Sequence, residues 1–317
     1  MSAPTIPTNG TLVEEDPTNG PLVENDAAVP AADDEAPPPL EPGAEVAPGY
    51  TVAALLRRGE DFDTYSAWSV TRYSHCVVKT PRPDRARDAS VRRILIREGR
   101  LLLAASHPHL VRAYELHAPR ESPPALVLEA LAGPSLADVL AEHGRLPAPI
   151  LGHLGRHLCS AARYLHGRGH LHLDIKPSNV VLSTGAARLI DLGLSRPPGP
   201  CRAGVGTARN MAPEQALGED VGPATDAWGI GLVLYEAATG HRPFGNGGDM
   251  WSCRCGEADC SWSEPRFLQL ERRAPKVRAR RRLPTEVAAA IDACLHRDPA
   301  RRPGLDELDA ALEELLP

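Results

Sequence analysis

Residues 172–179, which read His-Leu-Asp-Ile-Lys-Pro-Ser-Asn, constrain the fold of this chain more than any other stretch. They place an acid, a lysine and an amide at fixed steps along a short segment that also contains proline. Apolar residues at 161–165 and 180–181 flank this segment, so it is predicted to be a loop between two buried elements. Asp and Asn in a loop could serve only to cap a turn. With a lysine between them at this spacing, they instead indicate a catalytic loop.

Lysine is rare in this chain, and its positions are informative. Of the 35 Lys and Arg residues only three are lysines, at positions 79, 176 and 276. A lysine amine is a compact, strongly hydrated point charge, whereas the arginine guanidinium is a planar fork. Lys176 lies in the octapeptide, and Lys79 ends the strand-like run Cys-Val-Val-Lys. Two of the three lysines therefore lie where phosphate chemistry would need a point charge.

The first 50 residues differ in composition from the rest. They hold ten acids and no Lys or Arg, so residues 51–317 carry a net charge of +4 although the whole chain carries −6. Residues 1–47 are rich in Pro, Ala and Glu, and we expect them to be a disordered acidic tail. An imperfect repeat, Pro-Thr-Asn-Gly-Thr-Leu-Val-Glu at 7–14 and Pro-Thr-Asn-Gly-Pro-Leu-Val-Glu at 17–24, lies within it. The tail is either a solvated leader or a docking or self-phosphorylated segment, because Thr8, Thr11 and Thr18 lie in accessible chain.

Length and composition predict a globular protein. With 317 residues and 42% apolar composition, the chain can form one large or two ordinary domains around a real core. It contains no apolar run of bilayer length and no basic-then-apolar N-terminus, so a membrane partner is not expected. Seven cysteines without a secretory context predict thiols rather than disulfides. We therefore expect a cytoplasmic location.

Hydrophobic patterns predict strands followed by helices. Strand-like runs lie at 50–56, 65–71, 75–80 and 125–129, and helical patterns lie at 89–105, 135–143, 147–168 and 225–239. Most of the strand-like runs lie before residue 131, and most of the helical patterns lie after it.

The motifs along the chain resemble those of bacterial, actinobacterial-like, eukaryotic-type Ser/Thr protein kinases. In order they are Cys-Val-Val-Lys at 76–79, Glu98, the octapeptide, Ile-Asp-Leu-Gly at 190–193, Ala-Pro-Glu at 212–214 and Arg302. Any one of these motifs is weak, but the ordered series is specific. The resemblance covers residues 48–316. It implies an α+β, bilobal kinase fold with a sheet-rich N-lobe at 48–131 and a helical C-lobe at 132–316.

The resemblance also implies roles for individual residues. Asp174 would orient and deprotonate the acceptor hydroxyl, Lys176 would neutralise the γ-phosphate, and Asn179 and Asp191 would hold Mg²⁺. The lysine two places after the acid marks the Ser/Thr branch. The residues implied to bind ATP are Leu56, Gly59, Val77, Lys79, Glu98, Glu129, Leu131 and Leu182. Thr207 would contact the acceptor residue, and Arg302 would pair with a buried Glu214.

The segment at 56–65 departs from the family pattern because it keeps a single glycine, Gly59. Glycines let backbone amides approach the phosphates closely. Arg57, Phe62 and the acids Glu60 and Asp61 would crowd or repel that approach, which predicts weaker ATP affinity. The same departure supports an alternative function, a nucleotide-binding pseudokinase scaffold. A small-molecule kinase of the same fold fits less well, because Thr207, Glu214 and Arg302 would build a platform for protein substrates.

The octapeptide departs from the pattern as well, because Leu173 replaces an arginine that normally clamps a phosphate on the activation loop. Between Asp191 and Glu214 the only hydroxyl side chains are Ser195 and Thr207. The loss of the arginine clamp is consistent with the lack of a hydroxyl on the activation loop that would carry a phosphate. We therefore expect a protein kinase that is active without activation-loop phosphorylation.

An insert at about 246–263 holds three cysteines, at 253, 255 and 260. They could bind zinc with His241, but the spacing is not a common zinc pattern and favours a surface loop with reactive or pairing thiols. The most basic strip follows, with Arg266 and the basic residues between Arg272 and Arg282. Nucleic acid is an unlikely partner because no aromatic residues are interleaved. We favour docking of an acidic peptide, including the chain's own tail, and deletion of residues 1–47 should then alter activity or salt sensitivity.

Overall fold

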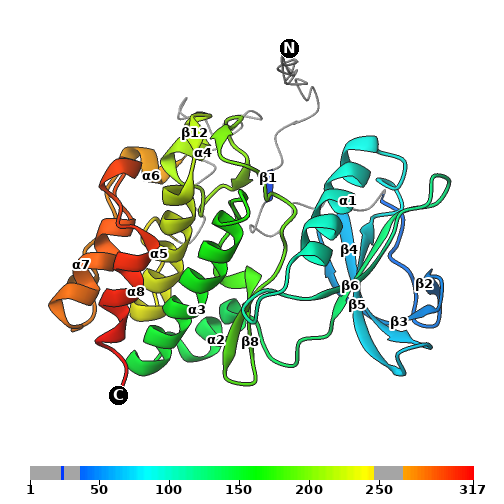
Figure 1. The fold of residues 1–317 in the computed structure, drawn as a ribbon, viewed down its shortest axis with the longest axis horizontal. Coiled ribbons are helices and arrows are strands. Elements are labelled where there is room, and N and C mark those ends of the chain that lie inside the picture. Colours follow the sequence, from blue (N-terminus) through cyan, green and yellow to red (C-terminus); the bar gives the residue numbers. More distant parts are fainter. Residues whose placement is uncertain (1–22, 25–35, 246–266) are drawn as a thin grey trace, which may run out of the picture.

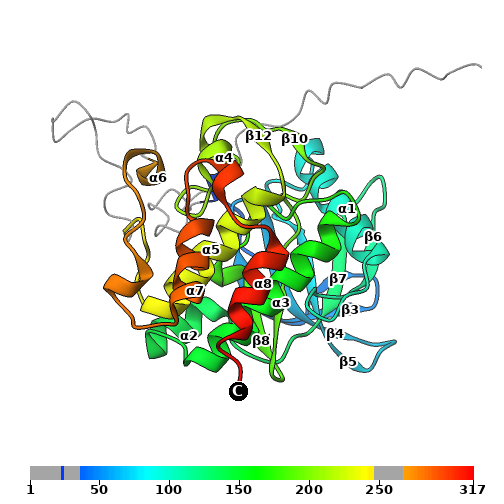
Figure 2. The ribbon, with the colours of Figure 1, turned by 60° about the vertical axis from the view of Figure 1, so that its left-hand side comes forward.

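The computed structural model describes residues 23–24, 36–245 and 267–317, which form two lobes (Figure 1). One lobe contains a curled antiparallel sheet and a long helix, and the other is almost entirely helical. Figure 2 shows the helices of the second lobe stacked beside one another. The α+β, bilobal architecture expected from the sequence is confirmed.

The N-lobe is built on a six-stranded antiparallel sheet in the order β2-β3-β4-β5-β7-β6. Its strands are β2 (Glu45–Ala47), β3 (Tyr50–Arg58), β4 (Phe62–Ser69), β5 (Ser74–Pro81), β6 (Ala113–His117) and β7 (Ala125–Glu129). In β4 buried residues alternate with half-buried ones, which is the period expected of a strand with one face on a core. Four of these strands match the predicted ranges within about three residues, and β2 and β6 were not predicted.

Helix α1 (Ala89–Ala104) packs on the sheet and begins at a clear cap. The carboxylate of Asp88 accepts hydrogen bonds from the backbone N–H groups of Ser90 and Val91. Leu95 and Leu102 are buried on the face toward the sheet, and Glu98 is buried on the same helix. The spacing of its leucines predicted both the helix and its core face.

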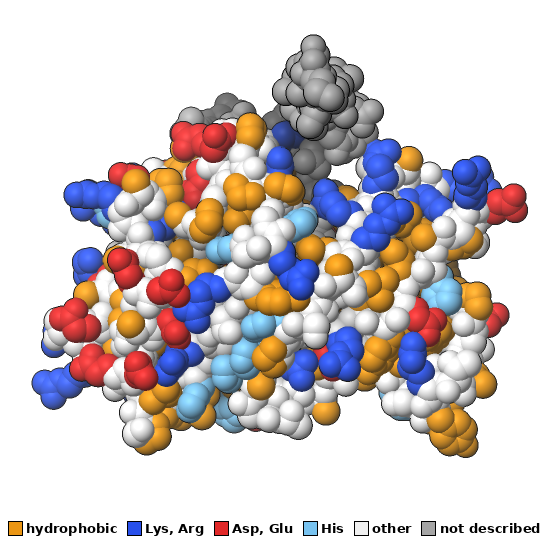
Figure 3. All heavy atoms as spheres, in the orientation of Figure 1, with side chains coloured by type: hydrophobic (Ala, Val, Ile, Leu, Met, Phe, Trp, Pro, Cys, Tyr) orange, Lys and Arg blue, Asp and Glu red, His pale blue; other side chains and the backbone are white. Residues whose placement is uncertain are grey.

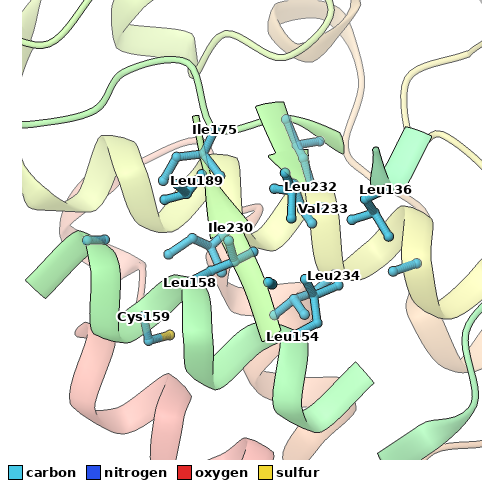
Figure 4. Packing of buried hydrophobic residues seen from close by; sticks show 14 of the residues in the cluster. Leu136, Leu154, Leu158, Cys159, Ile175, Leu189, Ile230, Leu232, Val233 and Leu234 are labelled. Atoms are coloured by element: carbon cyan, nitrogen blue, oxygen red, sulfur yellow. The ribbon is translucent and has the colours of Figure 1, made fainter. Parts of the chain in front are cut away.

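The C-lobe is a helical assembly whose core lies between α3, α5, α7 and α8 (Figure 4). Its helices are α2 (Leu136–His143), α3 (Ala148–His166), α4 (Pro213–Leu217), α5 (Pro223–Thr239), α6 (Leu268–Glu271), α7 (Thr285–Cys294) and α8 (Leu305–Glu313), with 3-10 turns η2 (Pro177–Asn179), η3 (Val277–Ala279) and η4 (Pro299–Arg301). A Cβ at Gly231 would lie 2.4 Å from the Cβ of Cys294. This glycine therefore allows α5 and α7 to approach closely.

Short two-stranded sheets accompany the helices of the C-lobe. Hairpin β8 (Val180–Ser183) and β9 (Ala186–Leu189) carries the loop residues that follow the octapeptide. Strand β10 (Gly199–Pro200) pairs antiparallel with β12 (Asp220–Val221). Strand β11 (Gly206–Thr207) pairs in parallel with β1 (Val23–Glu24), which comes from the N-terminal tail.

Contacts with the N-lobe sheet also occur before residue 48, the predicted start of the kinase domain. Glu45 and Ala47 pair with the start of β3, and the Leu40 N–H donates to the Tyr65 hydroxyl at 2.9 Å. The change in amino-acid composition near residue 50 did not indicate strand β2, because only three residues are needed to extend the edge of a sheet. The insert at 246–263 with its cysteine motif lies outside the described residues. Among the described residues, no helix is both long and apolar enough to span a bilayer.

Histidines gather on one face of the C-lobe (Figure 3). The rings of His109 and His157 are stacked with their centroids 4.0 Å apart, and His107 and His153 extend the row on either side. The cysteines of the described chain, Cys76, Cys159, Cys201 and Cys294, are free and buried, as the sequence predicted for thiols.

Candidate active site

The octapeptide is fixed by an acid on another element. Asp226, in the first turn of α5, is buried and accepts the backbone N–H of His172 at 2.9 Å and that of Leu173 at 2.8 Å. The Nε2 atom of His166 lies 2.7 Å from the same carboxylate. Leu173 adopts a φ of 66°, which is strained for a leucine and requires such anchoring. This role of Asp226 was not predicted from the sequence, although an acid in an otherwise apolar helix must find buried partners.

Asp174 lies in a cluster of hydrogen bonds formed by buried residues. Its carboxylate accepts from the Thr207 hydroxyl at 2.9 Å and from the Asn179 amide at 2.9 Å. The Lys176 Nζ lies 3.1 Å from the same carboxylate and 2.6 Å from Thr207 Oγ1. The octapeptide and the segment that contains Thr207 therefore meet at one carboxylate.

Lys79 joins the two lobes. Strand β5 presents its amine 2.9 Å from Glu98 Oε2 on α1 and 2.8 Å from Asp191 Oδ1, which follows β9. The second oxygen of Glu98 accepts the Leu192 N–H at 3.1 Å. Three segments that are far apart in the sequence therefore converge on one amine.

Burial and the neighbouring charges together shift the pKa values of Lys79, Asp191 and Glu98. Burial lowers the pKa of the Lys79 amine, but the carboxylates of Asp191 and Glu98 outweigh burial and raise it overall. Burial tends to raise the pKa of Asp191, and the nearby Lys79 ammonium outweighs it, so the pKa of Asp191 is lowered. Burial raises the pKa of Glu98 despite Lys79. Lys79 is therefore cationic and Asp191 anionic at neutral pH.

The chemistry of Asn179 and Asp191 fits a hard cation. Asn179 is fully buried, and its Oδ1 has no hydrogen-bond partner among the residues that the structure describes. A buried carbonyl oxygen in this state costs about 1–3 kcal/mol, and a bound cation would satisfy it. The Ile190 N–H donates to the Asn179 carbonyl at 3.0 Å, which brings Asp191 next to Asn179. Asp191 itself has a φ of 64°.

A pocket opens beside these groups between the β3–β4 turn, α1 and the segment after Asp191. Its lining includes Arg57, Gly59, Glu60, Asp61, Phe62, Thr64, Lys79, Ile94, Asp174, Asp191, Gly193 and Leu194. The turn is tight because the Gly59 N–H donates to the Phe62 carbonyl at 2.8 Å. The Lys79 amine lies 5.0 Å from the centroid of the Phe62 ring. An aromatic ring therefore occupies space near the lysine.

The other predicted nucleotide-binding residues lie outside the lining of this pocket. Leu56 is 57% exposed on β3, and Val77 on β5 lies opposite Leu128 of β7. The Glu129 carboxylate accepts the Arg112 N–H at 2.8 Å and contacts Arg188 at 3.0 Å, so this side chain serves the structure of the hinge. Leu131 and Leu182 are half-buried against the C-lobe core.

Apolar packing holds the activation segment. Leu173 is buried in a cluster with Leu171, Cys201, Val205 and Val221. The Ser195 hydroxyl donates to the Leu171 carbonyl at 2.6 Å and is buried. Where the family pattern places a phosphate clamp, this chain therefore has a hydrophobic contact.

Glu214 and Arg302 form a buried, two-pronged ion pair. The two Arg302 Nη atoms each lie 2.7 Å from one Glu214 carboxylate oxygen. The pairing predicted from the terminal motif is present. The next residue, Gln215, donates to the carbonyls of Leu173 and Val205, so the pair supports the platform around the octapeptide.

Comparison with known proteins agrees with this geometry. Residues 50–312 match the family described as protein kinase domain. The chain belongs to the protein kinase family. This kinase domain is 31% identical over 205 residues to the serine/threonine-protein kinase PknB of Mycobacterium leprae, a match that covers 62% of this chain and 33% of PknB. It is 32% identical over 244 residues to the serine/threonine-protein kinase PkaA of Streptomyces coelicolor, covering 74% of this chain and 42% of PkaA.

These relatives confirm the resemblance to bacterial eukaryotic-type Ser/Thr kinases. The kinase domain spans less than half the length of either relative. Membership in the family implies the use of ATP and a divalent metal ion in general.

Proposed function

We propose that this kinase domain transfers the γ-phosphoryl group of ATP, with Mg²⁺, to Ser and Thr hydroxyls of protein substrates. The observation that carries the proposal is the convergence of Lys79, Asp174 and Asp191 on one pocket. Phosphoryl transfer depends mainly on positioning and charge neutralisation, and this pocket supplies both. The names of the relatives support the choice of Ser/Thr acceptors.

Asp174 acts on the acceptor. An acceptor hydroxyl donates its hydrogen bond to this carboxylate and gives up its proton late in the reaction. Lys176 steadies the phosphoryl oxygens during transfer, because its amine lies 3.1 Å from the Asp174 carboxylate. Lys79, which Glu98 holds at 2.9 Å, contacts the nucleotide phosphates. Gly59, which lines the pocket, lies near the phosphates. Contacts of Leu56, Val77, Leu182 and the hinge backbone with the rest of the nucleotide, beyond the lining of this pocket, stay predictions from the family resemblance.

Asn179 and Asp191 would hold the magnesium ion. Its charge, when bound, offsets the negative charge of the phosphates. The support for these ligands is the buried, unpartnered Oδ1 of Asn179 beside the anionic Asp191. Oxygen ligands of this type suit Mg²⁺.

Activity does not require phosphorylation of the activation segment. The support is the apolar cluster around Leu173, together with the buried Ser195 and the Thr207 hydroxyl that is bonded to Asp174. The platform is thus held by packing that exists before any modification.

Two further parts of the proposal concern the tail and location. The acidic tail docks on another part of the same chain. The exposed basic residues between Arg272 and Arg282 remain the predicted binding surface for the parts of the tail that lie outside the described residues.

A cytoplasmic location stays a prediction from cysteine usage, and cell fractionation tests it.

The test is transfer from labelled ATP to a basic Ser/Thr peptide by the purified full chain. We expect Lys79→Met and Asp191→Ala to abolish transfer. Asp306→Ala is the matched control, because this side chain is 89% exposed on α8, far in sequence from the pocket. Nucleotide binding without transfer by the unmodified chain would instead support a pseudokinase scaffold, an alternative that the names of the relatives do not favour.

A further inference from the structure

The turn between β3 and β4 keeps a single glycine, and the N–H group of that glycine is already used. Gly59 is the one glycine in residues 56–65, and its N–H donates to the Phe62 carbonyl at 2.8 Å. Each residue carries one backbone donor, so an N–H that is bonded within its own turn is not available to a phosphate. The glycine amide is therefore lost as a phosphate donor, and another group is needed in its place.

A bulge in β3 turns Arg57 toward the cleft side of the sheet. In the register of β3 with β4, Leu55 lies opposite Tyr65. An unshifted register would then set Arg57 opposite Asp63, but Arg57 lies opposite Thr64. Asp63 is on the buried face of β4, where its carboxylate accepts a hydrogen bond from the Tyr65 hydroxyl at 3.1 Å. A one-residue shift moves a side chain to the other face of a sheet, so the bulge keeps Arg57 off this buried face.

Arg57 and Lys79 lie in one row across the sheet. Thr64 is paired with Arg57 of β3 on one side and with Lys79 of β5 on the other. Residues directly opposite each other on neighbouring strands share a face, so these three side chains lie on the same face. The backbones of Arg57 and Lys79 are two strand spacings, about 10 Å, apart. All three residues line the pocket described above, and its sheet wall therefore presents two cations.

The lining of the pocket has an excess of acids. Its ionisable residues are Arg57, Glu60, Asp61, Lys79, Asp174 and Asp191. A triphosphate is itself strongly negative, and without Arg57 it would meet Lys79 as the only cation of the described lining. The Arg57 charge also reaches the far side of the pocket. Burial tends to raise the pKa of Asp191, two lysines outweigh burial, and Arg57 lowers the pKa further.

We propose, on the basis of the function proposed above, that the Arg57 guanidinium binds the phosphates of ATP in place of the missing glycine amides. A guanidinium presents its N–H donors in a planar fork that fits two phosphate oxygens at once, whereas the Lys79 amine is a point charge. The amine therefore neutralises charge, and the fork adds direction. Arg57, which was expected from the sequence to crowd the nucleotide, is then a ligand for it.

Substitutions of Arg57 distinguish binding from crowding. Arg57→Gly restores the residue type that the kinase pattern has at this position, and Arg57→Gln removes the charge but keeps most of the length. If Arg57 crowded the nucleotide, Arg57→Gly would tighten ATP binding. Because Arg57 binds the phosphates, both variants should raise the Kd of ATP by about tenfold, the size of one charge-assisted hydrogen bond. Arg57→Lys keeps the charge without the fork, so its Kd should lie between.

The measurement is calorimetric titration of the full chain with ATP and Mg²⁺, repeated with adenosine. Adenosine has no phosphates, so its Kd should be the same in the unmodified chain and in the Arg57 variants, which also shows that the variants are folded. Arg100→Gln is the matched control, because Arg100 is exposed on α1 and lies outside the lining of the pocket. This control makes the same change in net charge and should leave the Kd of ATP unchanged.

Three results would overturn the inference. The first is a Kd of ATP in Arg57→Gly that is equal to or lower than that of the unmodified chain. The second is an equal loss of affinity for ATP and adenosine, which would indicate a structural role. The third is an unmodified chain that does not bind ATP, and the proposed function then falls as well. If the unmodified chain binds ATP and transfers phosphate while the Arg57 variants match Arg100→Gln, the present inference falls alone.

Discussion

The replacement of Arg302 by methionine tests the buried, two-pronged ion pair of the C-lobe. Arg302 is 7% exposed and Glu214 is 1% exposed, so neither charge is solvated by bulk water. Both Nη atoms lie 2.7 Å from Glu214 oxygens, and the Nε donates to the His296 carbonyl at 2.8 Å. The guanidinium also lies 5.0 Å from the centre of the Trp228 ring.

The magnitude follows from what the substitution leaves behind. Methionine fills much of the arginine stem volume, so the cost is mainly an uncompensated buried carboxylate, about 3–5 kcal/mol. One hydrogen bond to Glu214, from the Thr225 hydroxyl at 2.8 Å, remains. We therefore expect a loss of about 3–5 kcal/mol in the free energy of unfolding.

Urea unfolding followed by circular dichroism measures this loss. Arg163→Met is the matched control: Arg163 contacts Asp306 at 2.7 Å and Asp309 at 3.2 Å, but its side chain is 35% exposed. An exposed pair of this kind contributes about 0–1 kcal/mol. Glu214→Gln combined with Arg302→Met removes the stranded charge and should cost less than the sum of the single changes. A loss below about 1 kcal/mol for Arg302→Met, or strict additivity, would refute the reasoning.

Three further predictions concern the loop, the metal ligands and pH. Asp174→Asn should lower kcat by about 10²–10⁴-fold and leave the affinity for ATP nearly unchanged, because the acid acts on the acceptor. Turnover assays measure the first quantity and nucleotide titration measures the second, with Asp306→Asn as the control. Asn179→Ala should raise the Mg²⁺ concentration needed for half-maximal transfer, and an unaltered magnesium dependence would contradict its role as a ligand. Burial lowers the pKa of His157 to about 4, and its Nδ1 accepts the Ala187 N–H at 3.2 Å. The folded state therefore disfavours the protonated ring, so stability should be full above the ordinary histidine pKa of about 6.5 and fall as pH drops toward 4. His157→Gln should flatten that pH dependence of urea unfolding.

Local patterns in the sequence sufficed for most of the predicted elements. Alternation predicted β4, the leucine spacing predicted α1, and the apolar run before the octapeptide predicted α3. These signals are strong because each element must bury one face, and the period of that face is written in neighbouring residues. The short helices after residue 267 and strand β6 escaped prediction because their patterns are brief.

The pairings within the site were predicted only through resemblance to a family. Nothing in the local sequence says that Lys79 meets Glu98 and Asp191; the ordered motifs did, and the structure places the amine within 2.9 Å of both carboxylates. The replacement of Arg by Leu173 was visible in the sequence. Its consequence, burial in an apolar cluster beneath the activation segment, required the fold.

The sequence by itself determined the two-lobed fold and the set of charged residues that meet between the lobes. Only the tertiary structure decided that Asp226 anchors the octapeptide and that Val23–Glu24 pairs with β11. The physical reason is that almost every residue carries the same backbone N–H and C=O groups, so no pattern in the chain shows which of them a buried carboxylate or a strand edge will meet. Which segment meets which N–H is settled only when the chain is folded.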